Sequence, residues 1–304
     1  MNCLVLGGGG FIGTHICEGL LREGHHVRVL GRTQPDKANK LILDNVEWIM
    51  GDFSNLETIK KSMMNIDIIF HLVSTTNPKT SNDSPIIDMS SNVIPTLQLL
   101  DAAKDQGIKK IIFASSGGTV YGKPSIIPIP ETHPTFPTSS YGIHKLTVEK
   151  YLHMYFELYG LDYSVMRISN PYGEGQLPDR GQGVVATFLN RSLKNEKIEI
   201  WGDGSVIRDY IYISDVVSAA IKLLDYEGKE KIFNIGSGVG KTLIELIEII
   251  EHVANTTLNV NYIGGRKLDV PVNVLDIQRA KKLLLWEPKM SLFEGIERTK
   301  LMLK

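Results

Sequence analysis

The sequence predicts an α/β fold with a doubly wound parallel sheet, and three observations lead to this prediction. A short apolar run, residues 3–6, leads directly into a glycine-rich turn. Strand-like apolar runs then alternate with helix-length amphipathic segments through the first half of the chain. Several of these runs end in glycine, serine or aspartate, as expected where the carboxyl ends of parallel strands border a ligand.

The first predicted unit is a strand, a glycine turn and a helix. Residues 7–13 are Gly-Gly-Gly-Gly-Phe-Ile-Gly, and apolar residues at helical spacing continue over residues 12–21. Gly7 permits the tight turn, Gly10 leaves room for a pyrophosphate, and Gly13 lets the helix pack against the strand. Free N–H groups and the helix dipole at this point favour an anion. The glycine spacing alone leaves both a structural turn and a dinucleotide site open.

The second predicted strand, residues 27–30, is followed by Gly31 and Arg32. A dinucleotide fold usually has an acidic residue here, which binds the adenosine ribose and would repel a 2′-phosphate. An arginine would pair with that phosphate. The sequence therefore favours NADP(H), with Arg32 as the phosphate ligand, and does not exclude NAD. The alternative is an arginine in a solvated loop.

Further strands are predicted at residues 46–50, 66–72, 110–114 and 163–167, with a helix at residues 90–106. In an open parallel sheet the ligand lies beyond the carboxyl ends of the strands. The residues at these ends are therefore expected to line one cleft, and they are Gly51, Asp52, Phe53, His71, Leu72, Val73, Ser74, Ser115, Ser116, Gly117 and Gly118.

The length and composition fit an enzyme with small-molecule ligands. The chain has 304 residues, enough for two lobes, and its formal net charge of −1 gives no basic field for nucleic acid. Cys3 and Cys17 are too few for a disulfide framework, and neither they nor the eight histidines have metal-ligand spacing. No apolar stretch approaches the roughly 20 residues of a membrane span. Because the first strand begins at residue 2, we expect no cleavable targeting segment and a cytoplasmic protein. We expect neither a membrane partner nor a bound metal.

Tyr141 and Lys145 give the most informative chemical pattern. They are four residues apart, so on a helix their β-carbons would be about 5–6 Å from each other. The ammonium, joined by a cationic nicotinamide, would lower the phenol pKa from its reference value near 10, so that Tyr141 could take up or release a proton. Of the eleven tyrosines only Tyr141 has a lysine four positions later, although so short a pattern also occurs by chance. His144 is turned off this helix face and is expected to be structural.

Together with other motifs in order along the chain, these features resemble the extended short-chain dehydrogenase/reductases that act on nucleotide sugars. Within them the chain is most similar to the UDP-galactose 4-epimerase group, and the resemblance covers nearly the whole sequence. It depends on the glycine turn and on Asp52, Asn92, Ser115 with Ser116, Tyr121 with Gly122, Tyr141 with Lys145, residues 170–173, residues 208–210, Asp215 with Val216, residues 233–236, and Arg266 with Asp269.

The resemblance implies catalytic roles for four residues. Tyr141 would be the acid/base, and Lys145 would hold the nicotinamide ribose and lower the phenol pKa. A hydroxyl at the preceding strand end would bind the reacting sugar oxygen. Counting from the strand assigns this role to Ser116, but the stretch has one extra residue, so Thr119 is kept as the alternative. The residues implied to bind the cofactor are Gly7, Gly10, Phe11, Ile12, Gly13, Arg32, Asp52, Phe53, Leu72, Val73, Ser74, Asn92, Tyr141 and Lys145.

The resemblance also implies a substrate site. Asn170 would contact the diphosphate, and Arg208 and Arg266 would clamp the phosphates. Without the resemblance, Arg208 and Asp209 would be interpreted as a surface ion pair. The complete set implied to bind substrate is Ser116, Tyr141, Asn170, Val184, Ile200 and Trp201 beside the base, Arg208, Arg266, and Asp269 near the nucleoside ribose.

Two lobes follow from the same resemblance. Residues 1–171, joined by about 211–237, would form a Rossmann-type NAD(P)-binding domain. Residues 172–210 and 238–304 would form a smaller α+β lobe for the nucleotide sugar, with the active cleft between the lobes. Relatives commonly pair through two helices per subunit, which implies a homodimer.

The predicted activity is nucleotide-sugar 4-epimerisation by transient oxidation at C4 of a UDP-hexose or UDP-HexNAc, with a role in polysaccharide or O-antigen synthesis. The alternative is an NADPH-dependent reductase of an NDP-4-keto-6-deoxyhexose such as dTDP-4-keto-6-deoxyglucose, which Arg32 favours. A third hypothesis is a non-catalytic NADP(H)-sensing regulator, against which Tyr141 and Lys145 argue. Dehydration is not expected, because the strand end lacks the Thr-Asp-Glu set of related dehydratases.

The glycine-rich residues 236–242 do not form a P-loop, because the spacing of the required glycines is wrong. Thr242 and Glu245 instead predict a capping box at the start of a helix over residues 243–253.

Overall fold

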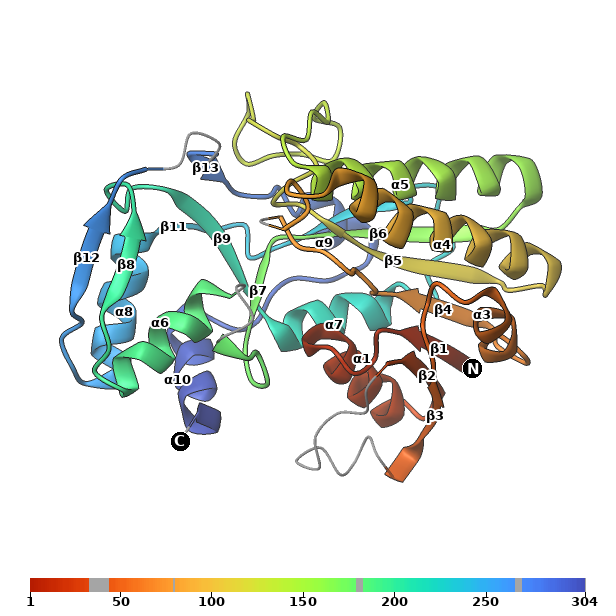
Figure 1. Ribbon diagram of the computed structural model, residues 1–304, viewed down its shortest axis with the longest axis horizontal. Coiled ribbons are helices and arrows are strands. Elements are labelled where there is room, and N and C mark those ends of the chain that lie inside the picture. Colours follow the sequence, from red (N-terminus) through yellow and green to blue (C-terminus); the bar gives the residue numbers. More distant parts are fainter. Residues whose placement is uncertain (33–43, 79, 179–182, 266–269, 304) are drawn as a thin grey trace. The chain divides into compact units, whose positions relative to one another are not determined.

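The computed structural model describes residues 1–32, 44–78, 80–178, 183–265 and 270–303. The chain divides into two compact units (Figure 1). The first unit contains Met1–Val120, Pro137–Arg167 and Val217–Phe233, and the second contains Tyr121–Phe136, Ile168–Val216 and Asn234–Lys304.

The first unit is built on a seven-stranded sheet in the order β10-β6-β5-β4-β1-β2-β3. β1 pairs in parallel with β2 on one side and with β4 on the other, so the order of the strands reverses at β1. Ligands of open α/β sheets bind beside such a reversal. The strands are β1 (Asn2–Leu6), β2 (His26–Gly31), β3 (Val46–Met50), β4 (Ile68–His71), β5 (Lys110–Ser116), β6 (Asp162–Ile168) and β10 (Ile232–Ile235), which confirms the predicted fold class.

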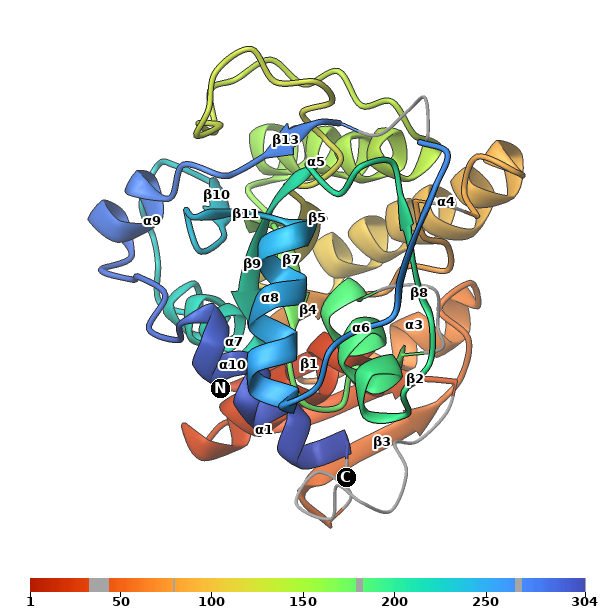
Figure 2. The same cartoon turned by 90° about the vertical axis from the view of Figure 1, so that its left-hand side faces the viewer.

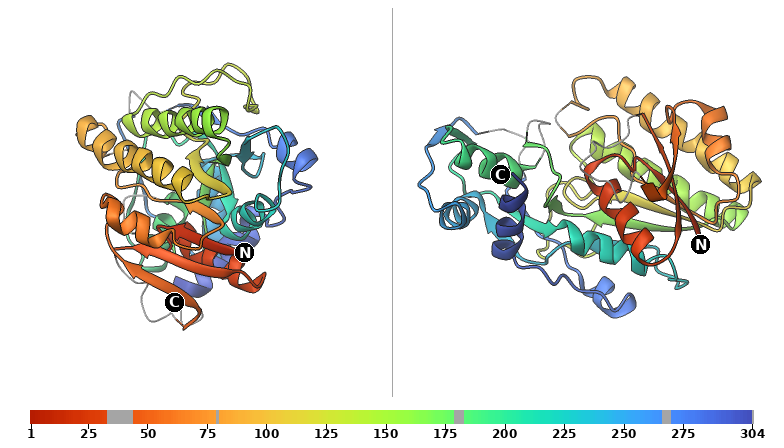
Figure 3. Two further views of the ribbon diagram at one scale, coloured as in Figure 1. Left: turned by 90° about the vertical axis from the view of Figure 1, so that its right-hand side faces the viewer. Right: turned by 90° about the horizontal axis from the view of Figure 1, so that it is seen from below.

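Helices cover both faces of this sheet. α4 and α5 lie side by side on one face, and α1 and α7 lie on the other (Figures 1 and 3). Fully buried side chains such as Leu4, Leu99 and Phe113 fill the core between the sheet and the helices. The helices that carry residues of this unit are α1 (Phe11–Arg22), α3 (Leu56–Ser62), α4 (Pro85–Asp105), α5 (Ser140–Tyr159) and α7 (Ile213–Lys222).

Helix α4 begins at Pro85, five residues before the predicted start at residue 90. Proline is favoured in the first helical turn, because its missing N–H needs no partner there. The first turn also carries Ile86 and Ile87, which are exposed, so it lacks the core-facing apolar period on which the prediction depended.

The second unit combines small sheets with helices. In the four-stranded sheet β9 (Ile207–Tyr212) pairs with β7 (Asn170–Tyr172), β11 (Gly240–Thr242) and β13 (Val272–Asn273). β8 (Ile198–Trp201) and β12 (Val260–Ile263) form a separate parallel pair. Figure 2 shows α6 (Val184–Leu193), α8 (Leu243–Ala254) and α10 (Leu292–Leu303) grouped together, while α9 (Gln278–Leu283) is short. Within the described ranges, no helix is both long and apolar enough to cross a membrane.

The predicted capping box at the start of α8 is confirmed. Thr242 Oγ1 accepts a hydrogen bond from Glu245 N at 3.0 Å, and Glu245 Oε2 accepts one from Thr242 N at 2.9 Å. Hydrogen bonds from Lys241 and Thr242 lower the pKa of Glu245 to about 2. The stabilising effect of the carboxylate is therefore present above its ordinary pKa of 4.5 and is lost as the pH falls towards 2.

Replacing Thr242 by alanine should lower the free energy of unfolding by about 1 kcal/mol, because Glu245 N at the start of α8 loses its side-chain acceptor. Urea unfolding measures the difference. Thr147→Ala is the matched control, since the Thr147 hydroxyl bonds only to the Ile143 carbonyl within α5. Equal stability of Thr242→Ala and the unchanged protein would contradict the prediction.

Candidate active site

The glycine turn between β1 and α1 is sterically constrained. Gly7 has φ = +86°, and a Cβ on Gly13 would lie 2.2 Å from the Gly7 carbonyl oxygen. A Cβ on Gly8 would lie 2.5 Å from Val29 Cγ2, so Gly8, to which the sequence analysis gave no role, is required for packing against β2. A Cβ on Gly10 would be 3.3 Å from the same Gly7 oxygen, a tight contact. The turn therefore brings backbone atoms closer together than side chains at Gly8 or Gly13 would allow.

The start of α1 fits the phosphates of a dinucleotide. Gly10 is the N-cap and contributes no side chain, and the first turn contains no acidic residue. The backbone N–H groups at Phe11 and Ile12 therefore face no capping carboxylate, and the helix dipole adds positive potential there. A Cβ on Gly7 would be 3.3 Å from Val73 Cγ2, so the end of β4 lies directly beside the turn. These features match the requirements of a pyrophosphate.

The structure places Arg32 and Asp52 directly after neighbouring strands. Arg32 follows β2 and is exposed, and Asp52 follows β3. Hydrogen bonds from Ser54 N and Ser54 Oγ, both 2.7 Å, hold the pKa of Asp52 below its ordinary value, and the charge of Arg32 adds to the effect. Phe53 is buried, and its ring packs against His71 with centroids 5.0 Å apart.

Tyr141 and Lys145 share one face of the start of α5, as predicted. Ser139 caps this helix by accepting a hydrogen bond from Gly142 N at 3.2 Å. Lys145 is buried, and its Nζ donates to the Ala114 carbonyl at 2.9 Å and lies 5.6 Å from the centroid of the Tyr141 ring. Lys145 therefore contacts the carboxyl-terminal part of β5.

The electrostatics of the pair are dominated by burial. Burial lowers the pKa of Lys145 to about 8, although the carboxylates of Asp88 and Glu149 oppose this shift. Burial, reinforced by Asp88, raises the pKa of Tyr141 to about 12. The phenol is therefore protonated at neutral pH, and a further positive charge is needed for it to ionise.

Both candidate hydroxyls lie near the end of β5. Ser116 is the last residue of the strand and is partly buried. Thr119 Oγ1 is buried and has no hydrogen-bond partner within the described ranges. A Cβ on Gly142 would lie 2.9 Å from the Thr119 carbonyl oxygen, so this segment is packed against the first turn of α5. Ser116 and Thr119 both remain candidates for the hydroxyl that binds substrate.

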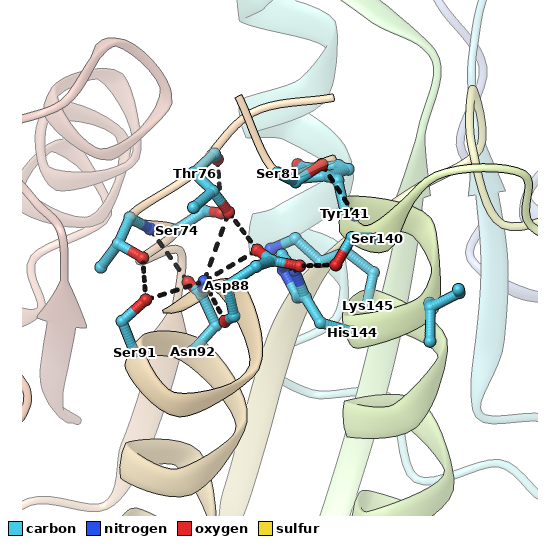
Figure 4. A network of polar contacts seen from close by, with 12 residues as sticks. Ser74, Thr76, Ser81, Asp88, Ser91, Asn92, Ser140, Tyr141, His144 and Lys145 are labelled. Atoms are coloured by element: carbon cyan, nitrogen blue, oxygen red, sulfur yellow. Dashed lines mark hydrogen bonds and ion pairs between the residues drawn. The ribbon is translucent and has the colours of Figure 1, made fainter. Parts of the chain in front are cut away.

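Asn92 connects α4 to the segment that follows β4 (Figure 4). Its Oδ1 accepts a hydrogen bond from Thr75 N at 2.9 Å, and its Nδ2 donates to the Asp88 carbonyl at 2.8 Å. Ser74 Oγ donates to the Thr76 carbonyl at 2.9 Å in the same segment. Asn92 and Ser74, both implied to bind the cofactor, thus belong to one polar network of the first unit.

The sequence analysis missed Asp88, which is fully buried at the centre of this network. Its carboxylate accepts hydrogen bonds from Ser140 Oγ at 2.7 Å, from His144 Nδ1 at 2.8 Å and from Thr76 Oγ1. Burial alone would raise the pKa of Asp88, but these hydrogen bonds outweigh it, and the pKa is lowered. Burial and the Lys145 charge lower the pKa of His144 to about 4, so a neutral imidazole faces a carboxylate.

One signal could have pointed to Asp88. It precedes Asn92 by four residues, so the two side chains share a helix face. The predicted helix began at residue 90, however, and this start left Asp88 outside it.

Two predicted substrate residues, Asn170 and Arg208, lie on or beside β9 in the second unit. Asn170 Nδ2 donates to the Asp209 carbonyl at 2.9 Å, and Arg208 Nη1 donates to the Val270 carbonyl at 2.8 Å. Asp209 is fully buried, and its carboxylate accepts hydrogen bonds from Ser237 N and Ser237 Oγ, both at 2.7 Å. The interpretation of Arg208 and Asp209 as a surface ion pair is therefore wrong, because Asp209 binds backbone and hydroxyl groups inside the unit.

The other predicted substrate residues differ in exposure. Ile200 is buried, whereas Trp201 beside it is 44% exposed, and Val184 is the first residue of α6. Arg266 and Asp269 lie outside the described residues. Over the described part of the chain, no group of three or more histidine, cysteine, aspartate or glutamate side chains could hold a metal ion.

A glycine turn at the reversal of a parallel sheet, with a partly buried tyrosine and a buried lysine at the start of α5, defines a dinucleotide-dependent enzyme of the short-chain dehydrogenase/reductase class. The chain belongs to the NAD dependent epimerase/dehydratase family, whose sequence profile matches residues 3–236.

Characterised proteins resemble the chain over almost its whole length. The dTDP-4-dehydro-6-deoxyglucose reductase of Escherichia coli is 38% identical over 306 residues, which cover 97% of this chain and 95% of the reductase. The structure of UDP-glucose 4-epimerase with UDP-glucose from Thermotoga maritima is 37% identical, with a TM-score of 0.94 and coverage of 99% of this chain and 98% of that chain. The Thermus thermophilus UDP-glucose 4-epimerase complex with NAD is 33% identical, with a TM-score of 0.91 and coverage of 100% and 99%.

Proposed function

We propose that this chain is a nucleotide-sugar 4-epimerase that acts on a UDP-hexose or UDP-HexNAc with bound NAD(P). The observation that carries the proposal is the Tyr141 and Lys145 pair at the start of α5. The buried lysine donates to the Ala114 carbonyl of β5, in the sheet whose strand β1 leads into the glycine turn. Both solved structures described above are of UDP-glucose 4-epimerases, and one of them is a complex with NAD.

In the proposed reaction the nicotinamide, when bound, supplies reversible hydride acceptance. Tyr141, as phenolate, takes the proton of the C4 hydroxyl while hydride leaves C4. Ser116, or Thr119 in its place, donates a hydrogen bond to the sugar oxygen. The 4-keto sugar turns over in the site and takes back hydride on its other face, and Tyr141 returns the proton. The reaction inverts C4 and leaves the cofactor unchanged.

Lys145 has two tasks in this scheme. Its ammonium stabilises the Tyr141 phenolate, and it binds the nicotinamide ribose. Because the pKa of Lys145 is about 8, most molecules still carry the ammonium at neutral pH. The Ala114 carbonyl, at 2.9 Å, fixes the direction of Nζ.

We assign cofactor binding to the first unit and the nucleotide sugar to the second. Asn170 and Arg208 would bind the diphosphate, with Arg266 as a second arginine. The exposed ring of Trp201 offers a stacking surface for a base, and Asp269 would bind the nucleoside ribose. The buried Asp209 holds the backbone around Arg208 in place through Ser237 and Leu275.

The direct test is incubation of the purified protein with UDP-glucose or UDP-GlcNAc and separation of the products. We expect the C4 epimer to form until equilibrium is reached, without net change in cofactor absorbance. If neither sugar nor any other nucleotide hexose in a broad panel is converted, the epimerase proposal fails.

A second candidate function is reduction of an NDP-4-keto-6-deoxyhexose by NADPH. Arg32 favours it, because an exposed arginine directly after β2 suits a 2′-phosphate, and one relative carries the name of such a reductase. Stoichiometric loss of NADPH with dTDP-4-keto-6-deoxyglucose would identify this activity. Nucleotide binding without turnover of any sugar would identify a sensor.

Replacing Arg32 by alanine should weaken NADPH binding by about tenfold to a hundredfold and leave NADH binding unchanged, because only NADPH carries the phosphate that the guanidinium would bind. Fluorescence titration measures both affinities. Arg22→Ala is the matched control, since Arg22 is an exposed arginine at the C-terminal end of α1, away from the glycine turn. Unchanged NADPH affinity in Arg32→Ala would remove the NADP(H) assignment.

We also infer a homodimer in the cytoplasm. The outer faces of α4 and α5 expose large apolar side chains, and two helices per subunit can form a four-helix bundle. Cys3 and Cys17 are free and buried thiols, which suits a reducing compartment. Sedimentation equilibrium tests the assembly. The exposed apolar side chains are Ile86, Ile87, Ile94, Ile143, Met154 and Leu158.

A further inference from the structure

The first turn of α5 is held by side chains from outside the helix (Figure 4). Ser140 N donates to Asn82 Oδ1 at 2.9 Å, and Tyr141 N donates to Ser81 Oγ at 3.1 Å. Ser140 Oγ donates to Asp88 Oδ2 at 2.7 Å. The backbone that carries the Tyr141 phenol is therefore fixed by the segment before α4 and by α4 itself.

Asp88 connects three segments through one carboxylate. Thr76 belongs to the segment after β4, Asp88 to α4, and Ser140 and His144 to α5. The carboxylate is fully buried and ionised, and a buried charge is tolerated only when its hydrogen bonds are satisfied. Movement of the start of α5 would break two of these bonds at once. The network thus resists displacement of Tyr141.

We propose that Asp88 is a positioning residue for Tyr141, because its hydrogen bonds to Thr76, Ser140 and His144 fix the helix turn that carries the reactive phenol. This inference rests on the proposed role of Tyr141 as the acid/base. Neither Asp88 nor His144 is proposed to contact the sugar. Both would affect the reaction by fixing the position of Tyr141.

The chain contains a natural comparison in the same pair of helices. Asp101 on α4 accepts a hydrogen bond from Tyr155 on α5 at 2.7 Å. Tyr155 is fourteen residues after Tyr141, which places it about 20 Å further along the helix. Both aspartates bridge α4 and α5, but only Asp88 does so beside the phenol. Asp88→Asn changes a contact between α4 and α5 beside Tyr141, and Asp101→Asn changes one far from it. Comparing the two variants distinguishes an effect on the position of Tyr141 from a general weakening of the contact between the two helices.

Asp88 also contributes charge at the start of α5. The other titratable groups around this turn are His71 on β4 and His144, Lys145 and Glu149 on α5. Both histidines are neutral, because burial lowers their pKa values to about 3 and about 4, and Glu149 is paired with Arg167. The Asp88 anion raises the pKa of Tyr141, so its removal shifts phenol ionisation to lower pH.

The experiment compares Asp88→Asn with Asp101→Asn in the full chain. For Asp88→Asn we expect kcat to fall by on the order of tenfold to a hundredfold with KM and NAD(P) affinity unchanged. The midpoint of the acidic limb of the pH profile should move to lower pH, because the Asp88 anion raises the pKa of Tyr141. Amide hydrogen exchange at Ser140 and Tyr141, measured without cofactor, should become faster. For Asp101→Asn we expect none of these changes.

An Asp88→Asn protein that folds and keeps both kcat and the pH profile overturns the inference, as does an equal loss of kcat in Asp101→Asn. If Asp88→Asn does not fold, Ser140→Ala is measured in the same way, since it removes one hydrogen bond and keeps the carboxylate. Unchanged kcat in Ser140→Ala then overturns the inference. Tyr141→Phe is assayed alongside: full activity in that variant refutes the proposed function, whereas its inactivity beside a fully active Asp88→Asn refutes only the role of Asp88.

Discussion

Tyr141→Phe should lower the rate of sugar conversion by on the order of 10²–10⁴ while NAD(P) still binds, because the phenylalanine ring fills the same space and cannot exchange a proton. Tyr141 N, which bonds to Ser81 Oγ, is unaffected by the loss of the hydroxyl. Turnover of UDP-glucose and cofactor titration measure the two effects separately. Full activity in Tyr141→Phe would remove the basis of the proposed function.

The control for this variant is Tyr155→Phe on the same helix. Tyr155 is buried, and its hydroxyl donates to Asp101. Its loss should cost about 1 kcal/mol of stability and leave turnover unchanged. A comparable loss of turnover in both variants would mean that α5 is merely sensitive to tyrosine replacement.

The pH dependence of turnover has a definite sign. As a base, Tyr141 must be ionised, and in the protein without ligand its pKa is raised to about 12. A cationic nicotinamide ring beside the phenol would lower that value in the working complex, so activity should rise with pH through the shifted pKa. The same rise ends when Lys145 loses its proton, because burial lowers the pKa of this lysine to about 8.

Gly13→Ala should prevent native packing of the turn and abolish dinucleotide binding. The new Cβ would lie 2.2 Å from Gly7 O and 2.7 Å from Gly8 Cα, and both contacts are backbone atoms that cannot rotate away. Such overpacking costs about 1–3 kcal/mol or more. Thermal unfolding and NAD(P) titration measure the two effects.

Two alanine variants calibrate this result. The Cβ of Gly264→Ala would have no atom of the described residues within 4 Å, so this variant should be neutral. Gly10→Ala makes a 3.3 Å contact with Gly7 O and should weaken cofactor binding with a small effect on stability. A Gly13→Ala protein with unaltered stability and NAD(P) affinity would show that this turn is not the constrained feature described above.

The fold was accessible from local patterns. β3 has the predicted bounds, residues 46–50, because a short run rich in β-branched and aromatic residues marks a strand. The shared face of Tyr141 and Lys145 followed from helical spacing alone. These features are determined by residues close together in the chain, and they can therefore be predicted from a single sequence.

The remaining parts depend on contacts between distant segments. Asp88 is one of many acidic residues in the sequence, and only its packing against Ser140 and His144, more than fifty residues away, distinguishes it from a solvated carboxylate. Asp209 is similar, since its partners Ser237 and Leu275 come from later segments. The choice between Ser116 and Thr119 depends on the register of the loop that follows β5, and hydrophobic periodicity does not fix the register of a loop.

The ammonium of Lys145 is needed for the proposed reaction, but its burial destabilises the folded protein. The shift of its pKa from 10.5 to about 8 corresponds to about 3 kcal/mol of lost stability at neutral pH. Since the unfolded chain binds this proton more tightly, resistance to denaturation grows as the pH rises from about 8 to 10.5. Any bound anion or hydroxyl that solvates Nζ relieves part of this tension. Ligands should therefore raise the melting temperature by more than their surface contacts alone would account for.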